Sequence, residues 1–194
     1  MGEGERGERI KGRLMMAGRK SMKSDLGAAG MAAVLEKASP EVRHTLTRRF
    51  LATDWYAQDT TDDVIRLVAA QLGMGAEEYA LQLGRNSAYE SAGRLGRTLV
   101  GLFGSPQRLA RYVPEYWSTL YDSGRVTAGY DESTKLLTLM IRDWKGHSAL
   151  RCYNPFGSMV ELSSRFKEPA LVEYKRVSCV SRGDAQCVYQ YRYG

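Results

Sequence analysis

The chain ends in LVEYKRVSCVSRGDAQCVYQYRY, residues 171–193, and this stretch decides the fold class. Two runs rich in Val, Tyr and Cys flank the turn signal SRGDA, a pattern typical of an antiparallel hairpin. A turn about Gly183 sets the register of the two strands. The opposed pairs are then Cys179 with Cys187, Val177 with Tyr189, and Lys175 with Tyr191.

The second strand of this hairpin carries its cysteine and its tyrosines on one face. Alternate residues of a strand point to the same side, and the residues on this side are Cys187, Tyr189, Tyr191 and Tyr193. We expect this face to be the inner one. Directly opposed residues have β-carbons about 4.5 to 5.5 Å apart, so Cys179 and Cys187 are placed to hold one metal ion or to form a cross-strand disulfide.

A third thiol completes the spacing Cys-x26-Cys-x7-Cys, because Cys152 precedes the hairpin in LRCYNPFG. Zinc prefers four ligands and suits thiolates, so Cys152, Cys179 and Cys187 are candidate zinc ligands. A fourth ligand is not evident, since Glu173 lies six residues before Cys179 and Arg176 is a cation. The alternative is that the three cysteines are buried structural residues.

Outward from the hairpin, the pattern predicts helices first and antiparallel strands last. The expected elements are a strand at 10–17, helices from 24 or 25 to Ser39-Pro40, from Pro40 to Trp55-Tyr56, at 61–72, over 77–102 and from Ser105-Pro106, a hairpin over 125–144, and a short helix at 156–165. The glycines within 77–102 suggest breaks or close helix-helix approach. This order predicts an α+β fold, with a helical layer packed on a C-terminal antiparallel sheet. We expect one domain over residues 10–194 behind a flexible basic segment, 1–9.

Composition and charge narrow the class of protein. Of the 194 residues 43% are hydrophobic and 26% are charged, which is globular composition. The net charge is +6, and seven basic against three acidic residues place +4 of it within residues 1–23. Nucleic-acid binding is nevertheless not expected, because no zinc-finger, RNA-recognition or helix-turn-helix signature accompanies the patch.

No stretch approaches the roughly 18 to 20 apolar residues of a membrane span, and the N-terminus has no apolar signal core. The odd number of cysteines favours a reducing compartment. Together these features predict a cytoplasmic protein without a membrane span.

The sequence predicts no enzyme. It contains no GxSxG, HExxH or phosphate-loop motif, and no set of nucleophile, base and acid can be placed. His147, in a KGHS turn, is expected at the loop surface. His44, on a helix, is expected at the surface or as a partly buried side chain with its hydrogen bonds satisfied, rather than as a ligand.

At this point a family resemblance appears. It is carried by Trp55-Tyr56, SPQRLARYVPEYW (105–117), YDSGRV (121–126), Cys152 with NPFGSMVEL (154–162), and the terminal hairpin. Together these resemble the superfamily of vinyl-4-reductase domains, haem-NO-binding domains and TRAPP trafficking subunits, closest to an uncharacterised myxobacterial branch. The resemblance implies a TRAPP/vinyl-4-reductase-like α+β domain with a cavity between its helices, often dimeric.

The superfamily's cofactors follow from the same resemblance. Aromatic-sensing regulators of this type have a zinc site of three Cys and one Glu; the cysteines match, but Arg176 stands where the Glu is expected. Haem-binding relatives need a proximal His and a Tyr-x-Ser-x-Arg clamp. Here Tyr89-Glu90-Ser91 is followed by Arg94 one position out of register. Zinc is therefore a candidate cofactor and haem is not expected.

We expect a non-catalytic sensory or regulatory domain that binds a small apolar or aromatic ligand in a helix-walled pocket and signals through protein contacts, as a homodimer. Large aromatic rings are the candidate pocket residues, because they enclose apolar molecules. They are Trp55, Tyr79, Tyr89, Phe103, Trp117, Tyr121 and Trp144. The alternative is an adaptor of TRAPP-like type, with a filled cavity and an exposed apolar patch that recruits proteins.

Overall fold

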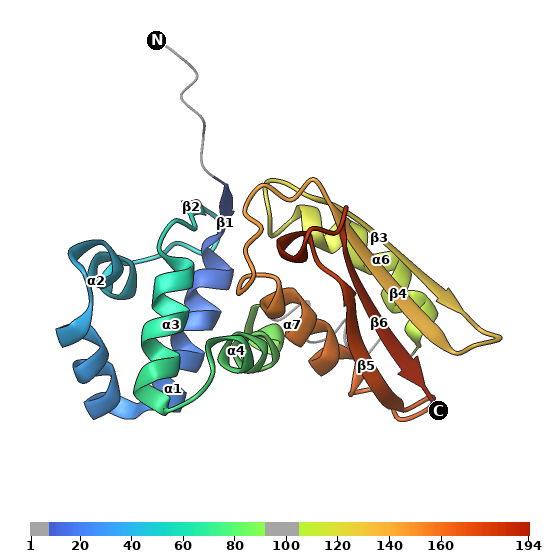
Figure 1. Ribbon diagram of the computed structural model, residues 1–194, viewed down its shortest axis with the longest axis horizontal. Coiled ribbons are helices and arrows are strands. Elements are labelled where there is room, and N and C mark those ends of the chain that lie inside the picture. Colours follow the sequence, from blue (N-terminus) through green and yellow to red (C-terminus); the bar gives the residue numbers. More distant parts are fainter. Residues whose placement is uncertain (1–7, 92–104) are drawn as a thin grey trace, which may run out of the picture.

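A computed structural model describes residues 8–91 and 105–194, without the side chains of residues 89–91. The helices within residues 12–91 form one side of the molecule and a twisted antiparallel sheet forms the other (Figure 1). The helix at 153–163 lies between them, and the helix at 106–118 lies against the sheet. The predicted α+β fold, a helical layer on a C-terminal antiparallel sheet, is confirmed. Among the described helices none is long and apolar enough to cross a membrane.

The N-terminal strand is much shorter than predicted. Strand β1 covers only Arg9–Lys11, and helix α1, Gly12–Lys37, follows at once where a strand to residue 17 and then a turn were expected. The helix can start there because Gly12 lets the chain pass close to residue 51; a β-carbon on it would lie 2.0 Å from the Leu51 carbonyl oxygen. Gly27, at φ 64°, interrupts α1 near the predicted helix start.

The N-terminal segment expected to be flexible, 1–9, is partly held in place. Arg9 pairs with Ala57 of strand β2, Trp55–Ala57, and its side chain forms an ion pair of 2.8 Å with Asp122. Glu8 is buried, at 8% exposure. Residues 1–7 lie outside the described part.

The residues that signal helix starts and ends predicted most bounds of the next two helices correctly. Helix α2, Pro40–Thr47, begins as predicted with Ser39 accepting a hydrogen bond from the Val42 N–H, but it ends before the predicted Trp55, which is in β2. Helix α3, Thr61–Leu72, ends at Gly73, whose φ of 70° a glycine adopts without strain.

The next two helices border the residues outside the description. Helix α4 covers Ala76–Ser91; its predicted continuation to 102 falls on residues 92–104, which are not described. Helix α6, Pro106–Ser118, starts at the predicted Ser105 cap and continues through Pro114, which was expected to kink or divide it.

The sheet has the order β3-β4-β6-β5 and is antiparallel throughout. Its strands are β3 Arg125–Asp131, β4 Leu136–Arg142, β5 Leu171–Ser178 and β6 Cys187–Tyr193. Helix α7, Tyr153–Ser163, begins three residues earlier than predicted and packs between α4 and the sheet. Helix α6 packs against β3 and β4.

The predicted register of the terminal hairpin is wrong by one residue over most of its length. Arg176 faces Tyr189, where Val177 was expected, and Tyr174 faces Tyr191, where Lys175 was expected. The reason is an irregularity between Arg176 and Ser178, since a bulge adds one residue to one strand and shifts every later pair. Cys179 lies just beyond β5 rather than in a paired position. The inner face of β6 is as predicted, with its cysteine and tyrosines at 0 to 2% exposure.

The buried apolar residues of the described chain form two cores. One lies between the sheet, α6 and α7, and the other lies among α1, α2, α3 and α4. They meet where α4 crosses α7, and both helices have a glycine at the crossing. A β-carbon on Gly84 would lie 2.1 Å from the Asn154 carbonyl oxygen, and one on Gly157 would lie 2.1 Å from that of Leu81. This bears out close helix-helix approach at Gly84.

Candidate functional site: a cysteine-histidine cluster and a helix-walled cavity

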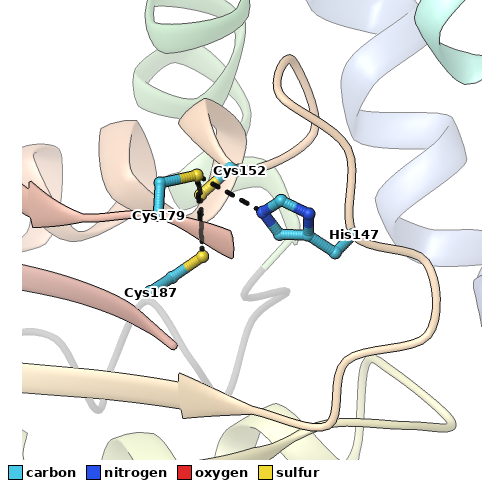
Figure 2. A group of neighbouring side chains, drawn as sticks. All are labelled: His147, Cys152, Cys179 and Cys187. Atoms are coloured by element: carbon cyan, nitrogen blue, oxygen red, sulfur yellow. Dashed lines mark hydrogen bonds between the residues drawn. The ribbon is translucent and has the colours of Figure 1, made fainter. Parts of the chain in front are cut away.

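Four side chains from separate parts of the chain converge beside the sheet (Figure 2). Cys152 directly precedes α7, and Cys187 is the first residue of β6. Cys179 precedes a short 3-10 helix, Val180–Arg182, in the β5–β6 connection. His147 comes from the loop after β4. The three cysteines are buried and none forms a disulfide.

The distances in this cysteine-histidine cluster are those of a metal-ligand set. The sulfur of Cys152 lies 3.4 Å from that of Cys187 and 3.5 Å from that of Cys179, and the third sulfur pair is 3.8 Å apart. The Nε2 atom of His147 lies 3.4 Å from the Cys179 sulfur. All four donor atoms lie within 4.8 Å of one another. Sulfurs around a tetrahedral zinc, with Zn–S near 2.3 Å, are about 3.8 Å apart, so the three cysteines and His147 fit zinc.

Hydrogen bonds within the cluster shift the pKa values of three of its members. The Cys152 thiol donates to Cys187, and this bond together with burial raises the pKa of Cys152 to about 12. The same bond lowers the pKa of Cys187. Hydrogen bonds to Cys152 and Cys179 raise the pKa of His147 against the effect of burial. The pKa values of these two thiols are therefore shifted in opposite directions, upwards for Cys152 and downwards for Cys187.

Polar neighbours surround the cluster without joining it. The Tyr189 hydroxyl lies 2.8 Å from the Cys152 sulfur, and the Ser181 hydroxyl lies 3.0 Å from that of Cys179. Arg176, which stands where the resemblance expects a Glu ligand, donates to the Tyr153 hydroxyl at 2.7 Å and stacks on that ring. Its guanidinium donates a hydrogen bond of 3.8 Å to the Cys179 sulfur.

The expectation that His147 lies at the loop surface is wrong. Its ring is half-buried and points into the cluster (Figure 2). The available signal was the closeness of His147 to Cys152 in the sequence, because structural zinc sites combine cysteine and histidine ligands. His44, by contrast, is exposed on α2 as expected.

A second feature is a cavity of about 90 Å³ in the helical part of the molecule. Its wall is mostly apolar and comes mainly from α1, α2, α3 and α4. Representative wall residues are Leu14, Met15, Met22, Leu46, Phe50 and Ile65. Of the seven aromatic residues predicted for a ligand pocket, Tyr121 and Trp144 lie on this wall.

The other predicted pocket aromatics lie elsewhere or outside the description. Trp55 is on β2, with the Lys11 ammonium 4.1 Å from its ring centre. Tyr79 is fully buried in the helical core, and Trp117 is in the sheet-side core, stacked on Tyr121. The spacing of apolar residues indicates that such aromatic side chains are buried. It does not indicate which of the two cores each one belongs to. The Tyr89 side chain and Phe103 fall outside the described part.

Polar wall residues gather around this apolar space. Gln58 is 4% exposed, and its Nε2 atom has no hydrogen-bond partner. Arg151 is held by Asp62 through an ion pair of 3.0 Å, and Arg19 donates to the Leu46 and Arg48 carbonyl oxygens. Sequence reasoning missed all of these residues, because single polar residues within helices and loops carry no pattern.

Comparison with solved structures finds the whole fold. An H-NOX protein from S. oneidensis in the Fe(II)NO ligation state is 16% identical, with a TM-score of 0.72, over 95% of this chain and 99% of that chain. An Fe(II) unliganded H-NOX protein from K. algicida is 11% identical, with a TM-score of 0.65, over 95% and 96%. A structure described by "Modulating Heme Redox Potential Through Protein-Induced Porphyrin Distortion" is 13% identical, with a TM-score of 0.67, over 94% and 99%.

At these identities the likeness shows the fold. It agrees with the haem-NO-binding part of the resemblance and leaves the vinyl-4-reductase, TRAPP and myxobacterial parts untested. No family model matches the sequence. No curated protein matches it either.

The expectation that haem does not belong to this protein is contradicted by these neighbours, which are iron-containing H-NOX proteins. The lack of an evident proximal histidine and of an in-register clamp motif was too narrow a ground, because a fold persists at identities where short motifs are lost.

The described wall can be tested against a haem. Haem iron is held by His, Cys, Met or Tyr, and neither histidine of the chain lies on the wall, since His44 is exposed and His147 is in the cluster. The donor types that the described wall offers are the thioethers of Met15 and Met22 and the phenol of Tyr121. In this part of the chain the cavity therefore does not fit a haem held through histidine.

Proposed function

We propose that the protein is a non-catalytic sensory domain that holds a small, largely apolar ligand in the helix-walled cavity and signals its occupancy through protein contacts. The observation that carries the proposal is the cavity, an apolar space with an unpaired buried amide at Gln58. A pocket with few polar groups is typical of small-molecule sites. The fold shared with H-NOX proteins supports the proposal.

The cavity wall connects the helical side to the sheet side, which gives a route for a signal. Asn154 of α7 and Trp144 of the loop after β4 lie on the wall with residues of α1 and α3. Asp62 at the start of α3 bonds both Arg151 and Ser148, at 3.0 and 2.8 Å. A ligand that moves α1 or α3 thus acts on the segment that leads into α7. The recipient is a partner protein, and we propose that the domain works as a homodimer.

Native mass spectrometry and thermal shift test this function. The purified protein is expected to carry a small molecule, or to gain several degrees in Tm when screened against small apolar compounds, because a ligand that binds only the folded state stabilises it. A protein that is bare in native spectra and shows no shift with any compound contradicts the proposal.

We also propose that Cys152, Cys179, Cys187 and His147 bind one zinc ion. Support comes from the donor distances, the burial of the thiols and the mixed sulfur and nitrogen set, which is a structural zinc type. Bound there, zinc would supply a cross-link between the loop after β4, the start of α7 and the β5–β6 connection. Elemental analysis of protein purified without chelator is expected to give about one zinc per chain, and protein purified metal-free that does not take up zinc contradicts it.

One observation favours the adaptor alternative. Strand β5 is at the edge of the sheet, and four apolar residues in and after it are exposed by 40 to 61%. They are Val172, Tyr174, Val177 and Val180. Exposed apolar patches mark protein contacts. If β5 recruits a protein while the cavity stays empty, Val172→Ser and Val177→Ser abolish that contact and no compound changes Tm.

A further inference from the structure

The wall of the helix-walled cavity carries positive charge. Its described wall includes two arginines, Arg19 and Arg151, and neither Asp nor Glu. Arg151 is neutralised by Asp62 at 3.0 Å. Arg19 is not neutralised, because none of the ion pairs in the described chain includes it.

A second arginine adds to this charge at one end of the cavity. The guanidinium groups of Arg19 and Arg48 lie 5.0 and 5.5 Å from the centre of the Phe50 ring, and Phe50 is a wall residue. Arg48 has no ion pair among the described residues either. Arg48 is exposed to water, which screens its charge, whereas Arg19 is half-buried on the wall. Charge next to apolar walls is screened less than charge in water, so Arg19 attracts anions to this end of the cavity.

The unpaired polar atoms of the wall point to the same ligand chemistry. The Nε2 atom of Gln58 is a donor and has no acceptor, although the residue is 4% exposed. The Thr61 hydroxyl, also on the wall, has no partner and is able to donate. Buried donors are nearly always paired in folded proteins. A ligand with a hydrogen-bond acceptor would therefore complete the hydrogen bonding of these two side chains.

We propose that the cavity ligand is a small monocarboxylic acid, whose apolar body lies among the methionine, leucine and isoleucine side chains and whose carboxylate accepts hydrogen bonds from the wall donors and pairs with Arg19. This inference rests on the proposed sensory function and specifies its ligand class. A cavity of about 90 Å³ is of the same order as one that holds benzene, so short-chain and single-ring acids are the right size.

Calorimetric titration with size-matched probes at pH 7 tests the inference. The probes are benzoate, benzyl alcohol and benzylammonium, and butyrate with 1-butanol as a second pair. At least one acid is expected to bind about tenfold more tightly than its alcohol, the effect of one charge-assisted hydrogen bond, and the ammonium is expected not to bind. If an alcohol binds as tightly as its acid, the ligand class is wrong and the cavity proposal stands. If no probe binds, the ligand class is wrong, and native mass spectrometry with the wider thermal-shift screen decides whether the cavity proposal stands.

Variants locate the carboxylate. Arg19→Met is expected to weaken acid binding about tenfold and alcohol binding less than twofold, while Arg19→Lys, which keeps the charge and the fold, retains most of the preference. Gln58→Met also weakens acid binding. Lys23→Met is the matched control, since Lys23 is exposed on the same helix and is not on the wall. Equal losses in Lys23→Met and Arg19→Met overturn the role of Arg19.

Discussion

The Nε2 atom of His147 lies 3.4 Å from the sulfur of Cys179, although the two residues are 32 positions apart. This contact ties the loop after β4 to the connection between β5 and β6. Trp144, three residues before the histidine, lies on the cavity wall. The cysteine-histidine cluster and the helix-walled cavity thus share the loop after β4. A change in the position of this loop at one site therefore also changes its position at the other.

Replacing the histidine tests the fourth zinc ligand. His147→Asn is expected to weaken zinc affinity by about one to two orders of magnitude, because three thiolates keep a residual site while the coordination stays incomplete. The measurement is competition with a chromophoric chelator. His44→Asn removes the chain's other histidine, which is exposed on α2, and is expected to leave the affinity unchanged.

Two results would contradict that assignment. One is equal zinc affinity in His147→Asn and the unchanged protein, which would leave a site of three cysteines. The other is an equal loss in His44→Asn, which would show that the effect is not local.

The crossing of α4 and α7 gives a prediction about stability. Gly84→Ala and Gly157→Ala would each place a β-carbon 2.1 Å from a backbone carbonyl oxygen, and neither backbone can move without separating the helices. We expect each to lower the free energy of unfolding by about 1–3 kcal/mol or more, measured by urea unfolding. Gly18→Ala in α1 meets no atom within 4 Å and is expected to gain about 0.5–1 kcal/mol.

The sequence was most informative where a local signal fixes a local geometry. The Ser39-Pro40 and Ser105-Pro106 caps and Gly73 marked helix ends that the structure confirms. Periodicity failed at residues 10–17, because a short apolar run satisfies a strand or a helix equally, and the close approach at Gly12 decides the matter. Such an approach involves a residue that is distant in the sequence, so the pattern of neighbouring residues does not predict it.

The candidate sites show the same limit. The three cysteines were found from their residue type and spacing, but whether the His147 loop turns inward depends on how residues 143–148 cross the end of the sheet. The cavity was expected from aromatic residues, whereas its wall is built largely from aliphatic and methionine side chains with single polar residues. Which apolar residues line a space and which fill a core is decided by packing in three dimensions.

A buried carboxyl near the shared loop predicts a pH dependence of stability. Burial raises the pKa of Glu8, whose Oε1 atom accepts a hydrogen bond from Ser123 and whose Oε2 atom has no partner. A raised pKa means that the folded state favours the protonated form. The contribution of Glu8 to stability is therefore full below the pKa of the unfolded chain and is lost as the pH rises through the folded pKa.

Glu8→Gln removes that loss. At pH 7 the variant is expected to have a Tm a few degrees above the unchanged protein. The difference is expected to shrink towards pH 4, below the ordinary glutamate pKa of 4.5, where the carboxyl is mostly protonated in both states. Glu36→Gln, at an exposed position of α1, is the control and should shift Tm equally at both pH values. A Glu8→Gln variant that is less stable than the unchanged protein at pH 7 would show that Glu8 is needed as a carboxylate.

Tryptophan fluorescence separates the cavity wall from the other aromatic residues. Trp144 is on the wall and is 7% exposed, whereas Trp55 is half-buried on β2 and is not on the wall. Titration with benzoate or benzyl alcohol, whichever binds more tightly, is expected to change the emission of the unchanged protein. Trp144→Phe should lose most of that change, and Trp55→Phe should retain it. Because Trp117 is 5.2 Å from Trp144 between ring centres, a smaller residual change in Trp144→Phe is expected from Trp117. Loss of the signal in Trp55→Phe with retention in Trp144→Phe would place the ligand outside the helix-walled cavity.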